Sequence, residues 1–458
     1  MIENYSVWLL LFGAFAWLLL RFSNRATATH KAQKVADGRL NGDVDPLDEA
    51  LDAMHNFSAA ARASTAGAAT LRTVFRINNP FSNGSEDLRK AYRQALTKTF
   101  AKTDGDAWDA IARAVSVSVR NMILSETGPD GSTILRANIM EISRTASMVA
   151  VLRALFNIDN VPGPTLAYIC SEIHRLGVWK KNMDMASSNP CAVPQVFVQN
   201  MNRLVSCLRD VFSEAKEKND LARLLLCSVS GTPEAFNPLD LIIPAFEAPW
   251  RAVLYSLLAV LQDRPSAVDE LLSLRDCPAR QRPSPQAKAV VYESLRLYPP
   301  VRRMRVSQKA KALQVFSTGG ISDVDRTIDA EAILRDPKYW GPTAAEWKPT
   351  RFLRTDGEID SSILSPNMAW IPFAAGGMKC PSAGGFSIRL TAVVAGEVLR
   401  QLFPRHGQMQ WHLEGPQWDL SSASGRLLRP GRDEYTHVDV VTRSDRLQAA
   451  GTRHVGTD

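Results

Sequence analysis

Apolar side chains recur at intervals of three and four residues along most of the chain, the spacing that places them on one face of an α-helix. This pattern predicts helices over 86–100, 107–124, 137–158, 197–217, 239–263, 284–297 and 387–403. Short strand-like runs occur near 304–316 and 436–442. We therefore expect one large domain, mainly α with a minor β part, and a kink in 239–263 where Pro244 and Pro249 interrupt it.

Near the N-terminus, the segment "YSVWLLLFGAFAWLLLRF" over 5–22 is nearly all apolar. Its length suffices for a thin membrane such as that of the endoplasmic reticulum. Arg21, Arg25 and Lys31 lie at its end or soon after, so the positive-inside rule places the rest of the chain in the cytosol. We predict a single-pass anchor over 1–22, a linker over 23–46 and a catalytic domain over 47–458. A cleaved signal peptide is the alternative, disfavoured by the missing basic n-region.

Composition and charge narrow the possible partners. The 458 residues are 45% hydrophobic and 22% charged, as in ordinary globular proteins, and the net charge is +7. Such a surplus suits an anionic membrane surface or an acidic protein as well as nucleic acid. The sequence has no basic block interleaved with aromatic residues and no zinc-ligand spacing, so we expect no nucleic acid partner. Its six cysteines are scattered without a C-x-x-C pair, which is typical of a reducing compartment.

Two stretches hold residues that can pair over a long distance in the chain. In "VYESLRLYPP" (291–300), Glu293 and Arg296 lie three apart and share a helix face. By itself this pattern is most often a surface ion pair of little energetic value. The turn-rich "RDPKYWGPTAAEWKPTRF" (335–352) contains Arg351, which could reach back to Glu293, or it is only a loop with aromatic anchors.

The stretch "FAAGGMKCPS" (373–382) has one cysteine at its centre, Cys380. Glycines precede it, a proline follows it, and a predicted helix begins a few residues later. Cys380 is either a buried structural thiol or a thiolate that binds a metal. The positive end of the following helix favours the thiolate.

In this order and spacing, the E-x-x-R helix, the aromatic-x-Pro-x-Arg-Phe coil and the F-x-x-G-x-x-x-C loop resemble the cytochrome P450 family, most of all its membrane-anchored fungal enzymes of secondary metabolism. The resemblance covers about 239–403 and the anchor. It implies a cytochrome P450-like fold with haem b, whose iron is bound by the Cys380 thiolate. It also implies a set of further site residues: Phe373 and Gly376 in the ligand loop, Glu293, Arg296 and Arg351 in a buried ion network, and Arg305 and Arg93 at the haem propionates. The alternative for the last two is solvated surface arginine.

The chain departs from the family's pattern at several positions. Met378 stands where Arg or His is usual two residues before the cysteine. Ala374 and Ser382 stand where the family has Gly or a small polar residue and Gly or Ala, respectively. In the distal helix, "PAFEAPW" keeps an acid, Glu247, as a candidate proton relay, but Ala248 follows where a hydroxyl is expected. The alternative for Glu247 is an ion pair with Arg251.

The resemblance implies a haem-thiolate monooxygenase that oxidises an apolar small molecule, such as a terpenoid or polyketide intermediate. Its electrons would come from an NADPH-cytochrome P450 reductase that docks on a basic face. Family members that isomerise or dehydrate their substrates without dioxygen also lack the distal hydroxyl, so this chemistry is a second hypothesis. A membrane-anchored helical scaffold without haem is a third.

Overall fold

The computed structural model describes residues 45–57, 68, 71–72, 76–79, 82–186, 195–213, 237–262, 268–308, 324–404, 410–415, 427–428 and 434–444. The predicted anchor and nearly all of the predicted linker lie outside these residues. The chain divides into two compact units, 1–50 and 51–458, and the description below concerns the second.

Twelve helices are defined within the described residues. They are α2 (Pro46–His55), α5 (Glu86–Lys102), α6 (Gly105–Arg120), α7 (Ile139–Phe156), α8 (Gly163–Ala186), α9 (Gln195–Ser213), α11 (Leu239–Leu261), α12 (Val268–Arg275), α13 (Pro285–Leu297), α14 (Ala330–Leu334), α15 (Pro337–Trp340) and α16 (Phe386–Leu402). The seven predicted helices are all present, with ends shifted by a few residues. Five helices were not predicted, namely α2, α8, α12, α14 and α15, and α15 lies in a stretch that was predicted to be coil.

Side-chain caps explain where several helices begin. Ser85, Asp104, Asn138 and Ser284 each accept a hydrogen bond from a backbone N–H of the first helical turn, at α5, α6, α7 and α13. The predicted helix over 107–124 was too long, because α6 ends at Arg120 and a strand begins at Leu124. The C-terminal residue of α7 is followed by Asn157 in the left-handed conformation, which stops that helix.

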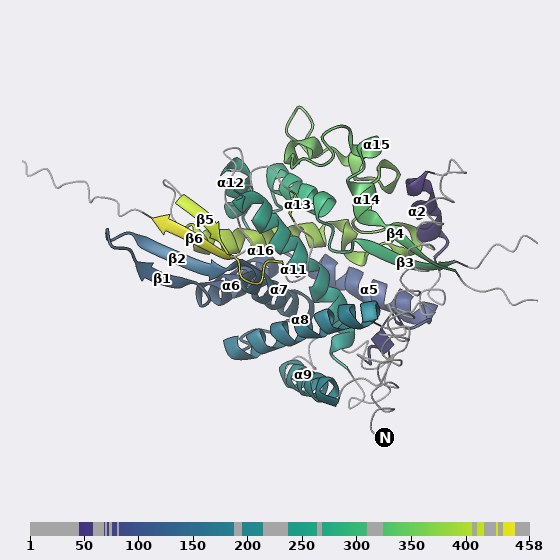
Figure 1. Cartoon of the computed structure of the whole chain (residues 1–458), viewed down its shortest axis with the longest axis horizontal. Coiled ribbons are helices and arrows are strands. Elements are labelled where there is room, and N and C mark those ends of the chain that lie inside the picture. The colour runs from purple at the N-terminus through teal and green to yellow at the C-terminus, as the bar shows by residue number, and fades with distance from the viewer. Residues whose placement is uncertain are drawn as a thin grey trace, which may run out of the picture. The chain divides into compact units, whose positions relative to one another are not determined.

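Helix α11 forms the centre of the core and packs against α7, α13 and α16 (Figure 1). Most of its side chains are buried, including Phe246 and Trp250. Both prolines lie inside it, and the helix is continuous across them; the kink stays a prediction. Among the described residues, α11 alone is long and apolar enough to cross a membrane. Because most of it is buried in the protein, we interpret it as a core helix.

Two antiparallel sheets make up the β part. One has the order β1–β2–β6–β5, formed by Leu124–Thr127, Thr133–Asn138, Asp439–Ser444 and Gln410–Glu414. The other pairs β3 (Arg303–Gln308) with β4 (Val324–Asp329). The two sheets lie at opposite sides of the view in Figure 1. Strands β3 and β6 correspond to the two predicted runs, whereas β1, β2, β4 and β5 were not predicted. The mainly α architecture with a minor β part is as expected.

Candidate functional site

The loop that contains Cys380 is closed by its own backbone. The N–H of Cys380 donates to the carbonyl oxygen of Phe373 at 2.9 Å, so the residues between them form a tight loop. Ala374 and Gly376 have positive φ angles, 54° and 51°. Glycine adopts such a φ without strain, whereas alanine does not. Two 3₁₀ turns complete the loop, η7 (Gly376–Met378) and η8 (Pro381–Gly384).

The chain before α5 packs closely behind this loop. A Cβ at Gly376 would lie 2.7 Å from Cα of His55 and 2.8 Å from the carbonyl oxygen of Met54. A Cβ at Gly377 would lie 3.1 Å from the carbonyl oxygen of Phe57. Only glycine at position 376 combines the required φ with this contact, which explains why the loop needs it.

One serine lies beside the sulfur of Cys380, and a second serine contacts the first. The thiol is free and half-buried, and its Sγ is 3.1 Å from Oγ of Ser382. Oγ of Ser387, in the first turn of α16, donates to Oγ of Ser382 at 2.5 Å. A hydroxyl therefore lies next to the sulfur at a position where the family usually has none.

Helix α5 braces the loop from one side. Nη1 of Arg89 donates to the carbonyl oxygen of Gly377 at 2.7 Å, and the same guanidinium forms an ion pair with Glu86. The sequence reasoning missed Arg89, because its partner is 288 residues away and no local pattern indicates that contact. Arg89 lies one helical turn before Arg93, the arginine of this helix that the sequence analysis assigned to the haem propionates.

Aromatic rings fix the start of α16, which follows the loop. The ring of Phe386 stacks on Phe100 of α5 with centroids 4.1 Å apart, and lies 5.3 Å from the ring of Trp108. The guanidinium of Arg389 covers Trp108 at 4.6 Å and donates to the carbonyl oxygen of Ala279 at 2.7 Å. Helices α5, α6 and α16 thereby hold the segment after Cys380 in place.

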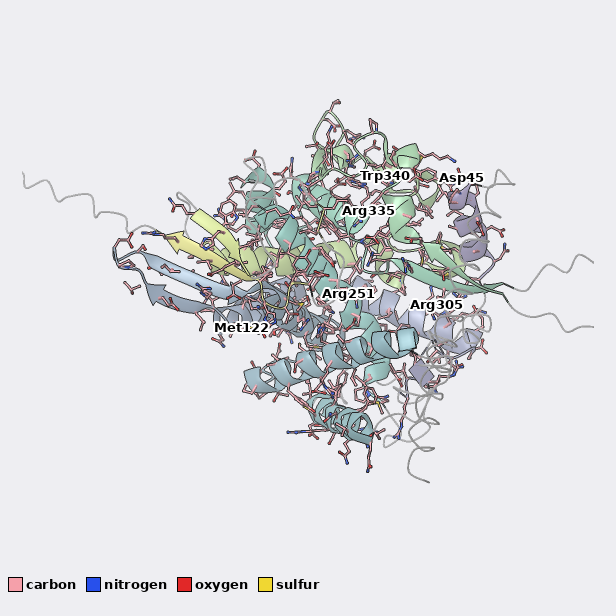
Figure 2. All side chains as sticks on the ribbon, in the orientation of Figure 1. Asp45, Met122, Arg251, Arg305, Arg335 and Trp340 are labelled. Atoms are coloured by element: carbon pink, nitrogen blue, oxygen red, sulfur yellow. The ribbon has the colours of Figure 1, made fainter. Side chains whose placement is uncertain are left out.

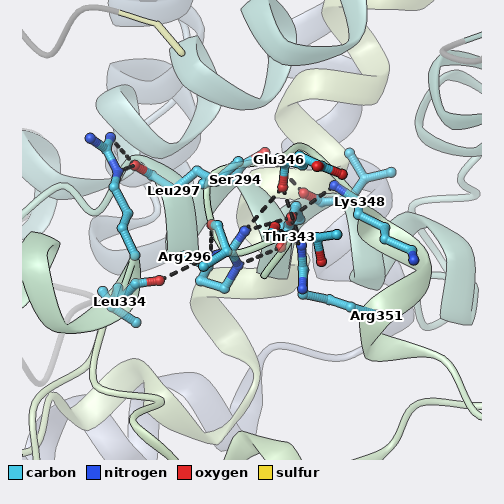
Figure 3. A network of polar contacts seen from close by, with 12 residues as sticks. Ser294, Arg296, Leu297, Leu334, Thr343, Glu346, Lys348 and Arg351 are labelled. Carbon is cyan, nitrogen blue, oxygen red and sulfur yellow. Dashed lines mark hydrogen bonds and ion pairs between the residues drawn. The ribbon is translucent and has the colours of Figure 1, made fainter. Parts of the chain in front are cut away.

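The residues of the predicted ion network meet in the core (Figure 3). Nε and Nη2 of Arg296 donate to the two carboxylate oxygens of Glu293 at 2.7 and 2.8 Å. Nε of Arg351 donates to Oε1 of Glu293 at 3.1 Å, and the backbone N–H of Lys348 donates to the same oxygen at 2.8 Å. Both Glu293 and Arg296 have 0% exposed side chains. The interpretation as a surface ion pair is therefore wrong, because α13 is enclosed by other elements.

The remaining N–H groups of the two arginines bind backbone carbonyls. Arg296 donates to the carbonyls of Leu334, Ala344 and Glu346. Arg351 donates from Nη2 to Thr343 and Glu346. One carboxylate and two guanidinium groups therefore join α13 to α14 and to the coil that leads toward the cysteine loop.

Glu247 is engaged in an ion pair within α11. Nη2 of Arg251 donates to its carboxylate at 2.5 Å, and Nη1 of Arg251 donates to the carbonyl oxygen of Pro300 at 3.0 Å. The structure thus shows the ion pair with Arg251 that the sequence analysis gave as the alternative role of Glu247. The pair attaches α11 to the chain just after α13, and Arg251 lies close to the middle of the view in Figure 2.

The structure does not bring Arg305 or Arg93 to the cysteine loop by any described contact. Arg305 is exposed on β3 (Figure 2), opposite Thr327 of β4. Arg93 is half-buried on α5. Their assignment to the haem propionates stays a prediction.

Two further buried groups lie between α5, the start of α11 and the cysteine loop. Burial, and then the negative charges of Cys380 and Asp240, raise the pKa of Tyr92. Burial raises the pKa of Asp240 to about 7, against a hydrogen bond from the backbone N–H of Asn78 that lowers it. The sequence reasoning missed both residues. A polar residue in the first turn of an apolar helix, Asp240, was the one available signal.

Comparisons with known proteins agree with this geometry. A family model described as Cytochrome P450 matches residues 282–382, the stretch that contains Glu293, Arg296, Arg351 and Cys380. The indoleacetaldoxime dehydratase of Arabidopsis thaliana is 31% identical over 142 residues, which are 30% of this chain and 26% of that protein. The cytochrome P450 monooxygenase xanG of Aspergillus fumigatus is 34% identical over 126 residues, 26% of this chain and 22% of that protein. The alignments thus span about a quarter of these curated relatives.

A solved structure supports the fold over nearly the whole chain. The cytochrome P450DA haem domain matches with a TM-score of 0.55 and 14% identity, covering 88% of this chain and 86% of that one. The fold is therefore that of a cytochrome P450 haem domain, and residues 282–382 match the Cytochrome P450 family model.

The residues of the loop fit a thiolate-bound haem. Cys380 is a free thiol that is only half-buried, on a loop closed by its own hydrogen bond and braced by Arg89. A hydroxyl lies within reach of its sulfur. A single thiolate is a sufficient protein ligand for haem iron, so the loop supplies the donor that this cofactor requires.

Proposed function

We propose that the chain is a haem-thiolate monooxygenase that oxidises an apolar small molecule, with Cys380 as the axial ligand of haem b. The observation that supports this most is the free thiol of Cys380, held on a braced loop within the stretch that the family model matches. Haem bound by a thiolate supplies the activation and cleavage of dioxygen. The protein then has to fix the sulfur, orient the substrate and deliver protons.

Each of these tasks has candidate residues. Phe373 and Gly376 shape the loop that presents the sulfur, and the Glu293–Arg296–Arg351 network keeps the surrounding core in place as a folding element. Arg305 and Arg93 are the proposed cations for the haem propionates; the exposure of Arg305 leaves its guanidinium accessible for such a role. Glu247 would move protons only after release from its ion pair with Arg251.

The proposed electron donor is an NADPH-cytochrome P450 reductase, because the chain has a net charge of +7, which suits an acidic partner. The apolar segment over 1–22 is proposed as an anchor in the endoplasmic reticulum membrane, with the catalytic domain over 47–458 in the cytosol. A terpenoid or polyketide intermediate is the proposed kind of substrate.

A second candidate function is dehydration or isomerisation without dioxygen. Two observations favour it. The carboxylate of Glu247 is bound to Arg251, and the next residues, Ala248 and Pro249, offer no hydroxyl for proton delivery. In addition, one relative is named a dehydratase, whereas another is named a monooxygenase.

Co-expression of the full chain with a P450 reductase, followed by metabolite profiling under isotopically labelled dioxygen, tests the two functions. A monooxygenase gives a product with one labelled oxygen atom, and only when NADPH is present. Turnover by purified holoprotein without NADPH, with no label in the product, contradicts oxygenation and supports the second function. A purified protein that binds no haem contradicts both and supports a scaffold.

A further inference from the structure

Ser382 and Ser387 form a chain of hydroxyl groups that ends at the sulfur of Cys380. Ser382 belongs to the 3₁₀ turn after the cysteine, and Ser387 to the first turn of α16. The two contacts measure 3.1 Å from sulfur to the first oxygen and 2.5 Å from the first oxygen to the second. All three side chains are half-buried, and the rings around Phe386 hold the start of α16.

The chemistry of these groups fixes the direction of the hydrogen bonds. A serine hydroxyl has one proton to donate and two lone pairs that accept. Ser387 donates to the oxygen of Ser382, which leaves the proton of Ser382 available for another acceptor. A thiolate has no proton and can only accept. With Cys380 ionised, Ser382 is therefore the donor and the sulfur the acceptor.

We propose that Ser382, oriented by Ser387, donates a hydrogen bond to the Cys380 thiolate and thereby weakens the electron donation from sulfur to iron. This inference rests on the proposed haem ligation by Cys380. Hydrogen bonds to a ligand sulfur tune the reduction potential of the metal, because they withdraw electron density from the ligand. We call the hydrogen-bonded chain from Ser387 through Ser382 to the sulfur the serine relay. This relay makes the iron easier to reduce than it would be in the same loop without a hydroxyl.

Ser382 departs from the family pattern at a position next to the sulfur. The family pattern has Gly or Ala two residues after the cysteine, and neither can donate from its side chain. The hydrogen bond from the Ser382 hydroxyl therefore adds to any hydrogen bonds that backbone N–H groups of the loop donate to the sulfur. Ser382 and Ser387 are positioning residues, since neither needs to touch the substrate.

The test uses the full-length holoprotein and two measurements that do not depend on turnover: the midpoint potential of the iron and the iron–sulfur stretching frequency. In Ser382→Ala and Ser382→Gly, we expect the equilibrium constant for reduction to fall roughly three- to tenfold, the effect of losing one hydrogen bond. The stretching frequency should rise, because the sulfur donates more strongly. Ser387→Ala should change both in the same direction by less.

Two variants serve as controls. Ser382→Thr keeps the hydroxyl and should restore both values toward those of the unmodified protein. Ser171→Ala removes an exposed serine hydroxyl on α8 and should change neither.

Suppose that the unmodified protein has a thiolate-bound haem and that Ser382→Ala leaves the midpoint potential and the stretching frequency unchanged. This result overturns the serine relay, and the proposed function still holds. An unmodified protein without thiolate-bound haem overturns both. If Ser382→Ala yields no holoprotein, Ser387→Ala decides, and unchanged values in that variant overturn the relay.

Discussion

Glu293 and Asp240 are both buried carboxylic acids, but the two regions around them handle charge in different ways. Glu293, 0% exposed, accepts hydrogen bonds from Arg296, Arg351 and the backbone of Lys348. Asp240, 3% exposed, accepts one from the backbone N–H of Asn78 at 2.7 Å, and burial raises its pKa to about 7. The two acids are buried to a similar depth, but Glu293 is buried together with two guanidinium groups, whereas Asp240 accepts a backbone N–H and has its pKa raised by burial.

The second region extends to the cysteine. The electrostatic influence of both Asp240 and Cys380 reaches Tyr92 of α5, whose pKa is raised, chiefly by burial. Ionisable groups with shifted pKa values are typical of functional sites, whereas a neutralised network is typical of a scaffold. We therefore interpret the Glu293 region as the part that holds the fold, and the region of Asp240 and Tyr92, whose pKa values are raised, as part of the candidate site.

Removal of the carboxylate from the first region should have the largest effect. Glu293→Ala leaves the guanidinium groups of Arg296 and Arg351 buried without their acid, which should cost about 3–5 kcal/mol of unfolding free energy. Denaturant unfolding measures it. Glu346→Ala is the matched control, because both arginines bind the backbone carbonyl of Glu346, which that substitution keeps. Equal stability of the two variants would show that the network does not hold the core.

In the second region, Asp240 should make stability depend on pH. Its folded pKa, about 7, lies above 3.8, the ordinary pKa of an aspartic acid side chain, which applies to the unfolded chain. Its contribution is therefore fully present below the unfolded pKa and is lost as the pH rises through 7. We expect the unfolding free energy to fall by on the order of 3 kcal/mol between about pH 5 and pH 8, and Asp240→Asn to remove most of this dependence.

Melting temperatures across this pH range measure the effect. Asp269→Asn, which changes an exposed acid on α12, provides the control. A pH profile that is the same in Asp240→Asn and in the unmodified protein would rule out Asp240 as its source.

Arg89 tests how firmly the cysteine loop is braced. Arg89→Gln removes the hydrogen bond from the guanidinium to the carbonyl of Gly377. This should destabilise the folded conformation of the loop by about 2 kcal/mol. The rate of haem transfer from holoprotein to an excess of apomyoglobin should increase accordingly. Lys90→Gln, an exposed neighbour on the same helix, should leave this rate unchanged. Equal rates in the two variants would remove Arg89 from the account.

The smallest effect concerns the backbone of the same loop. Ala374 has φ 54°, a conformation that costs a non-glycine residue about 1–2 kcal/mol, whereas glycine loses about 0.5–1 kcal/mol of conformational freedom on folding. Ala374→Gly should therefore stabilise the protein by at most about 1.5 kcal/mol. Ala383→Gly, in a loop position without positive φ, should destabilise it slightly. Thermal melting compares the two, and a loss of stability in Ala374→Gly would contradict strain at that position.

The sequence predicted what local patterns determine. Apolar spacing located seven of the helices, and the three motifs located the network and the cysteine loop. Contacts between residues that are far apart in the chain were harder to predict. Strand β2 pairs with β6 about 300 residues later, and neither pairing nor burial of Glu293 follows from nearby residues.

The same limit applies to the site. Arg89 was missed because only the fold brings α5 to Gly377. Ser382 was noticed as a departure from the family pattern, but its contact with the sulfur depends on the φ and ψ angles of the turn. Glu247 kept the expected residue type, yet its carboxylate is bound to Arg251, a choice that spacing alone left open.

The absorption spectrum of the reduced carbon-monoxide complex tests the central claim most directly. The unmodified holoprotein should show the red-shifted Soret band of a thiolate-ligated haem, and Cys380→Ser should lose this shift even where haem is retained. The same red-shifted band in Cys380→Ser would contradict ligation by Cys380.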